Sequence, residues 1–125
     1  MSLDGIAAWV KDAKEVIGFH HRLILRDLFI SIIDETPVKT GLLKGNWKVD
    51  FKALDFKAVD VKDPSGAITK RDVSAFISSV GAEDLSIFFS NNLPYAYTIE
   101  YDGYSRKAPE GMLYKNLIRV RSELE

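Results

Sequence analysis

The sequence predicts an α+β fold, in which a long amino-terminal helix and further helices pack on a small, mainly antiparallel β-sheet. Apolar residues recur at helical spacing near the amino terminus, and apolar residues alternate with polar ones in two later stretches. The 125-residue chain is 46% hydrophobic, which is enough for one buried core. We therefore expect a single domain over residues 1–125.

The first helix is predicted over residues 3–33, where apolar residues are spaced by three and four positions. This stripe contains Leu3, Ile6, Val10, Ala13, Ile17, Ile24, Leu28 and Ile32. His20 fills the one gap in it, and Thr36-Pro37 should end the helix. Such a helix is about 45 Å long, more than a small core requires. We expect it to project, to kink at Gly18 or to pack against a neighbouring subunit.

A first strand is predicted near residues 46–53, because Trp47, Val49 and Phe51 alternate with charged residues. Leu54 and Phe56 could continue the alternation, but Val59 and Val61 are out of phase with it. That shift predicts a bulge or the start of a second strand. Asp63-Pro64-Ser65-Gly66 has the composition of a turn.

Two helices and a strand are expected after this turn. Val73, Phe76, Ile77 and Val80 have helical spacing and favour a helix that stops at Gly81, although their β-branched neighbours leave a strand possible. Residues 85–92 alternate as a short strand. Pro94 then suits the first turn of a short helix that carries Tyr95 and Ile99.

A last helix is expected to begin at Pro109 and Glu110. Its apolar face would consist of Met112, Leu113, Leu117 and Val120.

Composition excludes several classes of function. Seventeen basic and eighteen acidic residues give a formal charge of -1, which does not favour non-specific binding to nucleic acid or to an anionic membrane. The absence of cysteine excludes disulfides, thiolate metal sites and cysteine nucleophiles. Apolar runs are far shorter than the roughly 20 residues that span a bilayer, and we expect the protein to be made and kept in a cytoplasm.

Candidate catalytic and ligand-binding residues favour structural interpretations. His20 and His21 are adjacent and point about 100° apart on a helix, so we expect His20 at the edge of the core and His21 in solvent. Glu100 is expected to cap a loop or to pair with Arg106 or Lys107. The glycines form neither a P-loop nor a dinucleotide fingerprint. No cofactor and no catalytic residue is predicted.

Two blocks of sequence resemble the tail-completion, or head-to-tail joining, proteins of long-tailed bacteriophages and prophages. The first block is residues 36–47, Thr-Pro-Val-Lys-Thr-Gly-Leu-Leu-Lys-Gly-Asn-Trp. The second runs over residues 91–112, from Asn-Asn-Leu-Pro-Tyr-Ala through Ala-Pro-Glu-Gly-Met. The structural landmarks of the two blocks are Gly41, Trp47, Asn92, Pro94, Tyr95, Glu100, Gly103, Pro109 and Gly111. Asp102 and Lys107 depart from the pattern of the family.

The resemblance implies a non-enzymatic structural protein of the virion neck, assembled in the cytoplasm of a bacterial host. Several copies, expected to number about six, would form a ring between the portal complex and the tail, and DNA would pass through it without specific binding. The ring's partners would be portal-complex, neck or tail-terminator proteins. We expect its contacts to include the first helix and two loops, with Lys39, Thr40, Lys44, Tyr104, Arg106 and Lys107.

Three alternatives remain open from the sequence. A tail terminator or minor tail protein would also be small, free of cysteine and ring-forming. A small hydrolase would use Glu100 or His20, although no nucleophile, base and orienting group converge in the sequence. A regulator would dimerise through the first helix, but a stripe with spacing near 3.6 lacks sustained heptads.

Overall fold

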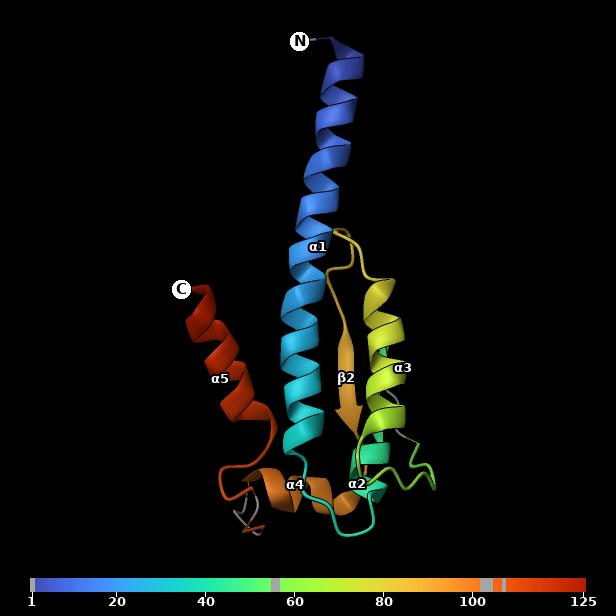
Figure 1. Cartoon of the computed structure of the whole chain (residues 1–125), viewed down its shortest axis with the longest axis vertical. Coiled ribbons are helices and arrows are strands. Elements are labelled where there is room, and N and C mark those ends of the chain that lie inside the picture. The colour runs from blue at the N-terminus through green and yellow to red at the C-terminus, as the bar shows by residue number, and fades with distance from the viewer. Residues whose placement is uncertain (1, 55–56, 102–104, 107) are drawn as a thin grey trace.

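The structure, a computed structural model, describes residues 2–54, 57–101, 105–106 and 108–125. In this part of the chain the elements are α1 (Leu3–Glu35), α2 (Leu42–Gly45), β1 (Trp47–Asp50), α3 (Ala67–Ser78), β2 (Phe88–Asn91), α4 (Pro94–Tyr101) and α5 (Leu113–Leu124). Figure 1 shows α1 as the long axis, with α3 and the strands on one side of its lower half and α5 on the other. The predicted α+β class is confirmed.

Helix α1 begins and ends where the sequence predicts, with two more residues at its carboxyl end. The Ser2 hydroxyl accepts a hydrogen bond from the Gly5 amide at 3.1 Å, and Thr36 closes the helix before Pro37. The helix continues through Gly18 as one element. Only its lower half is packed, because every residue from Ser2 to Ile17 except Ala13 is exposed. The upper half projects (Figure 1).

The core forms where the lower half of α1 meets α3 and the sheet. Phe29, Ile33 and Ile77 are at most 5% exposed. The Phe89 ring stacks on Phe29 with centroids 4.2 Å apart, and on Trp47 with centroids 4.7 Å apart. These stacked rings join the sheet to α1.

The sheet described has two short antiparallel strands, and its register places Trp47 opposite Asn91 and Asp50 opposite Phe88. Both strands were predicted, but both are shorter than expected. The bulge or second strand expected around Val59 and Val61 is wrong for the described residues, which contain no strand between β1 and α3. Phe56 lies outside the described residues.

Hydrogen bonds to one side chain replace a strand pairing at Val59. The Asn46 amide nitrogen donates to the Val59 carbonyl at 2.9 Å, and the Val59 amide donates to Asn46 Oδ1 at 2.7 Å. Asn46 is 1% exposed. A buried asparagine thus satisfies the backbone that a neighbouring strand would otherwise satisfy.

Helix α3 confirms the choice of helix over strand for residues 73–80. It starts earlier than the apolar spacing indicated, at Ala67, and ends at Ser78, shortly before Gly81. The predicted turn precedes it, with the Gly66 amide donating to the Asp63 carbonyl at 3.0 Å. Asp63 Oδ2 accepts the Thr69 amide at 2.7 Å and caps the first turn of the helix.

Helix α4 starts at Pro94 as predicted, but the expected start of α5 at Pro109 and Glu110 is wrong. Gly111 has a φ of 82°, which a helix cannot contain, so α5 starts only at Leu113. The predicted apolar face of α5 is also partly wrong, because Leu117 is 50% exposed whereas Asn116 is buried.

Polar contacts tie α5 to the lower half of α1. Arg119 donates from Nη2 to Asp27 Oδ1 at 2.9 Å and to Ser31 Oγ at 3.1 Å, and Lys115 lies 3.6 Å from Glu35.

Among the described helices, none has an apolar stretch long enough to cross a membrane.

Candidate functional site

The block 36–47 folds into a tight loop followed by α2. Thr36 Oγ1 donates to the Ile32 carbonyl at 2.7 Å and accepts the Trp47 indole N–H at 2.9 Å, so both ends of the block are held against α1. Gly41 adopts a φ of 87°, and a Cβ there would overlap the backbone of Asp63 and Pro64. The glycine therefore allows residues 63–64 to lie directly on the loop.

The block 91–112 is joined to the first block by Asn91. Its side-chain nitrogen donates to the Leu43 carbonyl at 2.7 Å, while its oxygen accepts the Leu93 amide at 3.3 Å. The chain then turns into α4, where Ala96 and Ile99 are buried. Two segments separated by more than forty residues in the sequence are thus held side by side by a defined contact.

A groove of about 720 Å³ lies where the two blocks meet. Its walls are residues 37–43 on one side and Tyr95, Thr98, Ile99, Ser105 and Arg106 on the other. We call this feature the loop groove. It lies at the end of the molecule opposite to the projecting helix, near the bottom of Figure 1.

The loop groove combines an apolar interior with cationic and hydroxyl groups. Leu43 and Ile99 are buried, whereas Lys39 and Arg106 are exposed. Partial burial raises the pKa of the Tyr95 phenol above its ordinary value, so this side chain is a neutral hydrogen-bonding group at physiological pH. Chemically, the loop groove suits a protein segment that carries an apolar side chain next to acidic groups.

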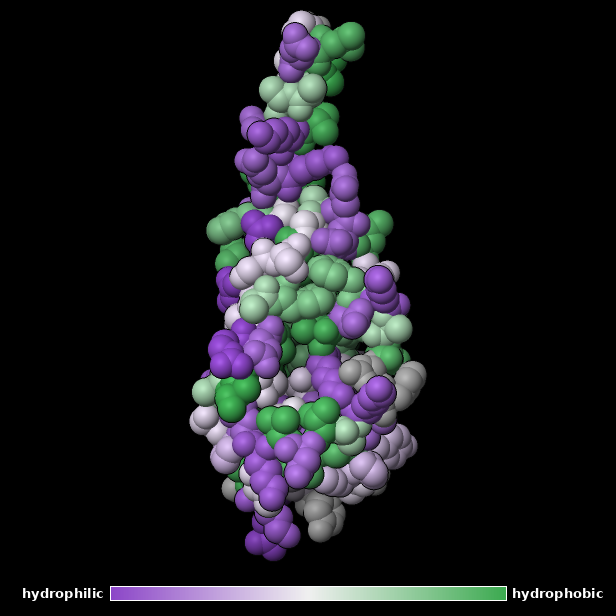
Figure 2. Space-filling view, turned by 90° about the vertical axis from the view of Figure 1, so that its right-hand side faces the viewer, coloured by the Kyte–Doolittle hydropathy of each residue, from purple (hydrophilic) through white to green (hydrophobic). Residues whose placement is uncertain are grey.

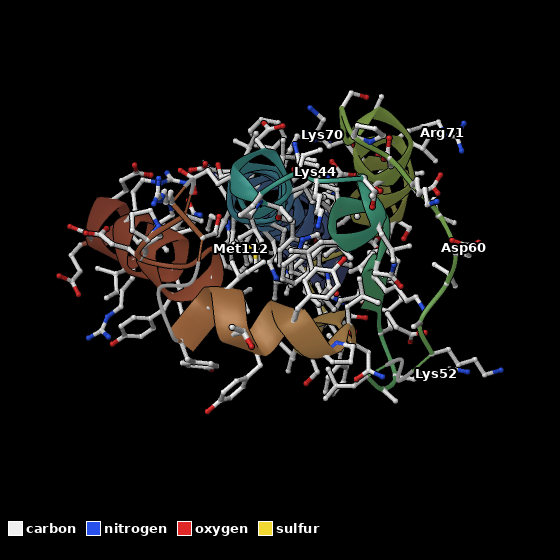
Figure 3. The ribbon with its side chains drawn as sticks, turned by 90° about the horizontal axis from the view of Figure 1, so that it is seen from below. Lys44, Lys52, Asp60, Lys70, Arg71 and Met112 are labelled. Atoms are coloured by element: carbon white, nitrogen blue, oxygen red, sulfur yellow. The ribbon has the colours of Figure 1, made fainter. Side chains whose placement is uncertain are left out.

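Three of the predicted contact residues, Lys39, Thr40 and Arg106, come together at the loop groove. Lys44 is not part of the groove lining, and it is buried, with only 7% of its surface exposed. Figure 3 shows its side chain among those inside the molecule, while Lys52 and Asp60 lie at the outer edge. Lys44 is therefore placed to support the fold and not to meet a partner. Tyr104 and Lys107 lie outside the described residues.

Glu100 caps α5. Its Oε2 accepts the amides of Met112 at 2.6 Å and Leu113 at 2.8 Å, and its Oε1 accepts the amide of Tyr114 at 2.9 Å. The sequence predicted that Glu100 caps a loop or pairs with Arg106 or Lys107; it caps the start of a helix instead, and this role occupies both carboxylate oxygens. A Cβ on Gly111 would lie 2.7 Å from Glu100 Oε2, so glycine is required for this approach.

The remaining landmark residues lie around α4. Trp47, Asn92 and Pro94 line a second pocket of about 360 Å³ on the opposite face of α4 from the loop groove. Pro109 is exposed and follows the fully buried Ala108. Gly103 lies outside the described residues.

The two histidines are placed opposite to expectation. His20 is exposed, with its ring 5.6 Å from that of Phe19, and His21 is partly buried with Nδ1 3.4 Å from the Gly81 carbonyl. Within the described ranges, no group of three or more histidine, aspartate and glutamate side chains is arranged to hold a metal ion.

Sequence reasoning missed the apolar wall of the loop groove, and it missed the carboxylate that caps the start of α3. Tyr95, Thr98 and Ile99 have the i, i+3, i+4 spacing of one helical face, which could have indicated that wall. Asp63 was assigned only to a turn, although it lies at a helix start that a carboxylate would stabilise.

No protein-family model, no curated protein and no solved structure matches this chain.

Proposed function

We propose that this chain is a non-enzymatic structural protein of virion assembly, which joins or completes the head–tail interface of a long-tailed phage or prophage as a ring. The supporting observation is that the two blocks carrying the family resemblance form the two walls of one groove. Residues that are shared for their chemistry at a contact are expected to converge in this way.

The loop groove is suited to docking because its walls are held rigidly. The first wall is held against α1 by the hydrogen bonds of Thr36 and Trp47. The second wall is joined to the first by the hydrogen bond of Asn91 to the Leu43 carbonyl. A wall that is ordered before binding loses little conformational entropy when a partner arrives. In the proposed ring, an acidic segment of a neighbouring subunit or of a portal or tail protein occupies the groove between Lys39 and Arg106.

The experiment is light scattering after size exclusion, from low micromolar to near-millimolar protein, with negative-stain images of any large species. We expect closed rings at high concentration, each of about six copies and either single or joined in pairs. Lys39→Glu and Arg106→Glu should each reduce the fraction of rings at least severalfold while leaving the melting temperature unchanged. Lys52→Glu, which changes an exposed charge outside the groove lining, is the matched control.

A second arm tests the proposed partners with purified portal-complex, terminator and tail-tube proteins from a phage that carries this gene. Binding that Arg106→Glu abolishes supports the neck role, and binding to the tail tube alone makes the protein a tail terminator. The proposal fails if the wild-type chain neither forms rings nor binds any of the three.

A further inference from the structure

The projecting half of α1 carries an apolar face that no other part of the described chain covers. Its large side chains are between 38% and 86% exposed, and they are Leu3, Ile6, Trp9, Val10, Val16 and Ile17. Leu23, 44% exposed, ends the series. Figure 2 shows hydrophobic side chains along one edge of the projecting helix and hydrophilic ones beside them. We call this surface the apolar helix face.

Charged side chains are absent from this face. At 100° per residue, the positions from Leu23 round to Leu3 cover an arc of about 160°, and up to Ile24 this arc contains His20 but no aspartate, glutamate, lysine or arginine. Lys11, Lys14 and Glu15 lie outside this arc, where they border the loop that contains Glu83. A partner for the apolar helix face must therefore be apolar itself.

The face also continues into a known helix contact. Asp27, Ser31 and Glu35 follow it on the same side of α1, and these are the residues that bind α5. From Leu3 to Ile24 the stripe, with His20 as one of its positions, advances by alternating steps of three and four. This run is too short for the sustained heptads of a long coiled coil but is long enough for a short helix pair, and Leu28 then breaks the alternation. A second helix packed on the upper half of α1 would thus lie on the same side of α1 as α5 does on the lower half.

The apolar positions along the face are symmetrical about Ala13 except at one pair, because Ile6 and His20 lie seven residues on either side of it. Val10 and Val16 lie three residues on either side of it, and Trp9 and Ile17 lie four residues on either side. The same holds at the ends of the face, where Leu3 and Leu23 lie ten residues from Ala13. A two-fold contact requires that residue i meets j while j meets i, and this spacing meets that requirement with the small alanine at the axis.

We infer that the apolar helix face binds the same face of a second copy of this chain, antiparallel, about a two-fold axis next to Ala13. The antiparallel direction follows from α5, which occupies the same side of α1 from Asp27 onward. A parallel pair would bring together the α5 helices and the packed lower parts of the two copies, whereas an antiparallel pair places these lower parts at opposite ends.

The area of the face is sufficient for such a pair. The exposed fractions of its side chains correspond to about 450 Å² of apolar surface per copy. Stable interfaces bury about 800 Å² per partner, of which about 60% is apolar. The face therefore supplies nearly all the apolar area that a standard two-fold interface contains.

The first test uses the absence of cysteine from the chain, which makes any introduced thiol unique. Antiparallel helices with axes 8–10 Å apart bring the Cα atoms next to the axis within about 6 Å, a distance that a disulfide spans. Ala13→Cys should form a covalent dimer under mild oxidation. Residue 15 points away from the face, and the two copies of residue 3 lie at opposite ends of the pair. Glu15→Cys and Leu3→Cys should therefore each cross-link at least tenfold more slowly than Ala13→Cys.

The second test is sedimentation velocity of the otherwise unmodified chain at low micromolar concentration. We expect a species of about twice the 14.1 kDa chain mass. Ile17→Glu should convert it to monomer, whereas Leu85→Glu, which changes a 90% exposed leucine away from the face, should not. Circular dichroism of each variant checks that α1 is folded.

Three results would overturn the inference: a wild-type chain that stays monomeric, a dimer that Ile17→Glu leaves intact, or Leu3→Cys cross-linking as fast as Ala13→Cys. The inference does not rest on the proposed neck function. Substitutions in the loop groove test that function, and substitutions on α1 test the pair, so either can fail alone.

Discussion

At the residue scale, single side chains satisfy backbone groups that the fold leaves without a regular partner. Glu100 accepts three amides at the start of α5, Asn46 replaces a strand opposite Val59, and Thr36 links the Trp47 indole to the end of α1. Leaving such a polar group buried without a hydrogen-bond partner costs more free energy than the hydrogen bond itself contributes to stability. The fold is therefore most sensitive to changes at these few positions.

Gly111→Ala tests the closest of these approaches. The added Cβ would lie 2.7 Å from Glu100 Oε2 in a backbone with φ of 82°. We expect a loss of about 1–3 kcal/mol in the free energy of unfolding, measured from urea midpoints at constant slope. Gly81→Ala is the matched control, because its Cβ would meet only Asp84 Oδ2, at 3.7 Å. Equal stability of the two variants would contradict the capping geometry.

At the element scale, helices were easier to predict than their contacts. The apolar spacing of α1 and α3 and the proline of α4 identified these elements, since periodicity and helix starts are local properties. The start of α5 was missed because the φ of Gly111 depends on Glu100, eleven residues earlier in the sequence. For the same reason Lys44 was taken for a surface charge: its burial depends on packing that the sequence pattern does not contain.

The candidate site could be predicted in part. Both walls of the loop groove lie in the two blocks that carry the resemblance, but the sequence did not show that the blocks form a groove. That the blocks touch follows from the hydrogen bond of Asn91 to the Leu43 carbonyl. The apolar stripe of α1 was recognised over its whole length, and projection beyond the core was one of the three arrangements expected for it. The structure buries only the lower part, because α3 and α5 reach no further.

Asp63→Asn tests how α3 is held at its start. Burial alone would raise the pKa of Asp63, but hydrogen bonds from Thr69 and Ile68 and the charge of Lys44 outweigh burial and lower it below 3.8. A lowered folded-state pKa adds stability above the unfolded pKa, and this stability is lost as the pH falls through the folded pKa. The wild type should therefore exceed the Asn variant most at pH 7, with a gap that narrows below pH 4.

Urea midpoints at pH 7, 5, 4 and 3 measure that gap. The asparagine keeps one acceptor oxygen for the Thr69 amide, so the variant should remain folded. A gap that stays constant over this range would show that the charge of Asp63 contributes nothing to holding α3.

At the scale of the whole molecule, the two proposed contacts lie at opposite ends of one long axis. The loop groove is near α2 and α4, and the apolar helix face is on the upper half of α1 (Figure 1). A ring at a head–tail junction is polar, since its two sides meet different partners, whereas a two-fold pair is not. The proposed pair would therefore belong to the free protein, where it would cover an apolar face that otherwise promotes aggregation.

If both contacts form in solution, concentrated wild-type protein should contain two rings joined through paired α1 helices, with about twelve copies in all. Ile17→Glu should halve this species to single rings, because it places a charge in the apolar helix face and leaves the loop groove unchanged. Arg106→Glu should instead reduce it to pairs. Light scattering with negative-stain images measures both. If Ile17→Glu abolished the rings themselves, α1 would be part of the ring contact, and two separate interfaces would be the wrong description of this molecule.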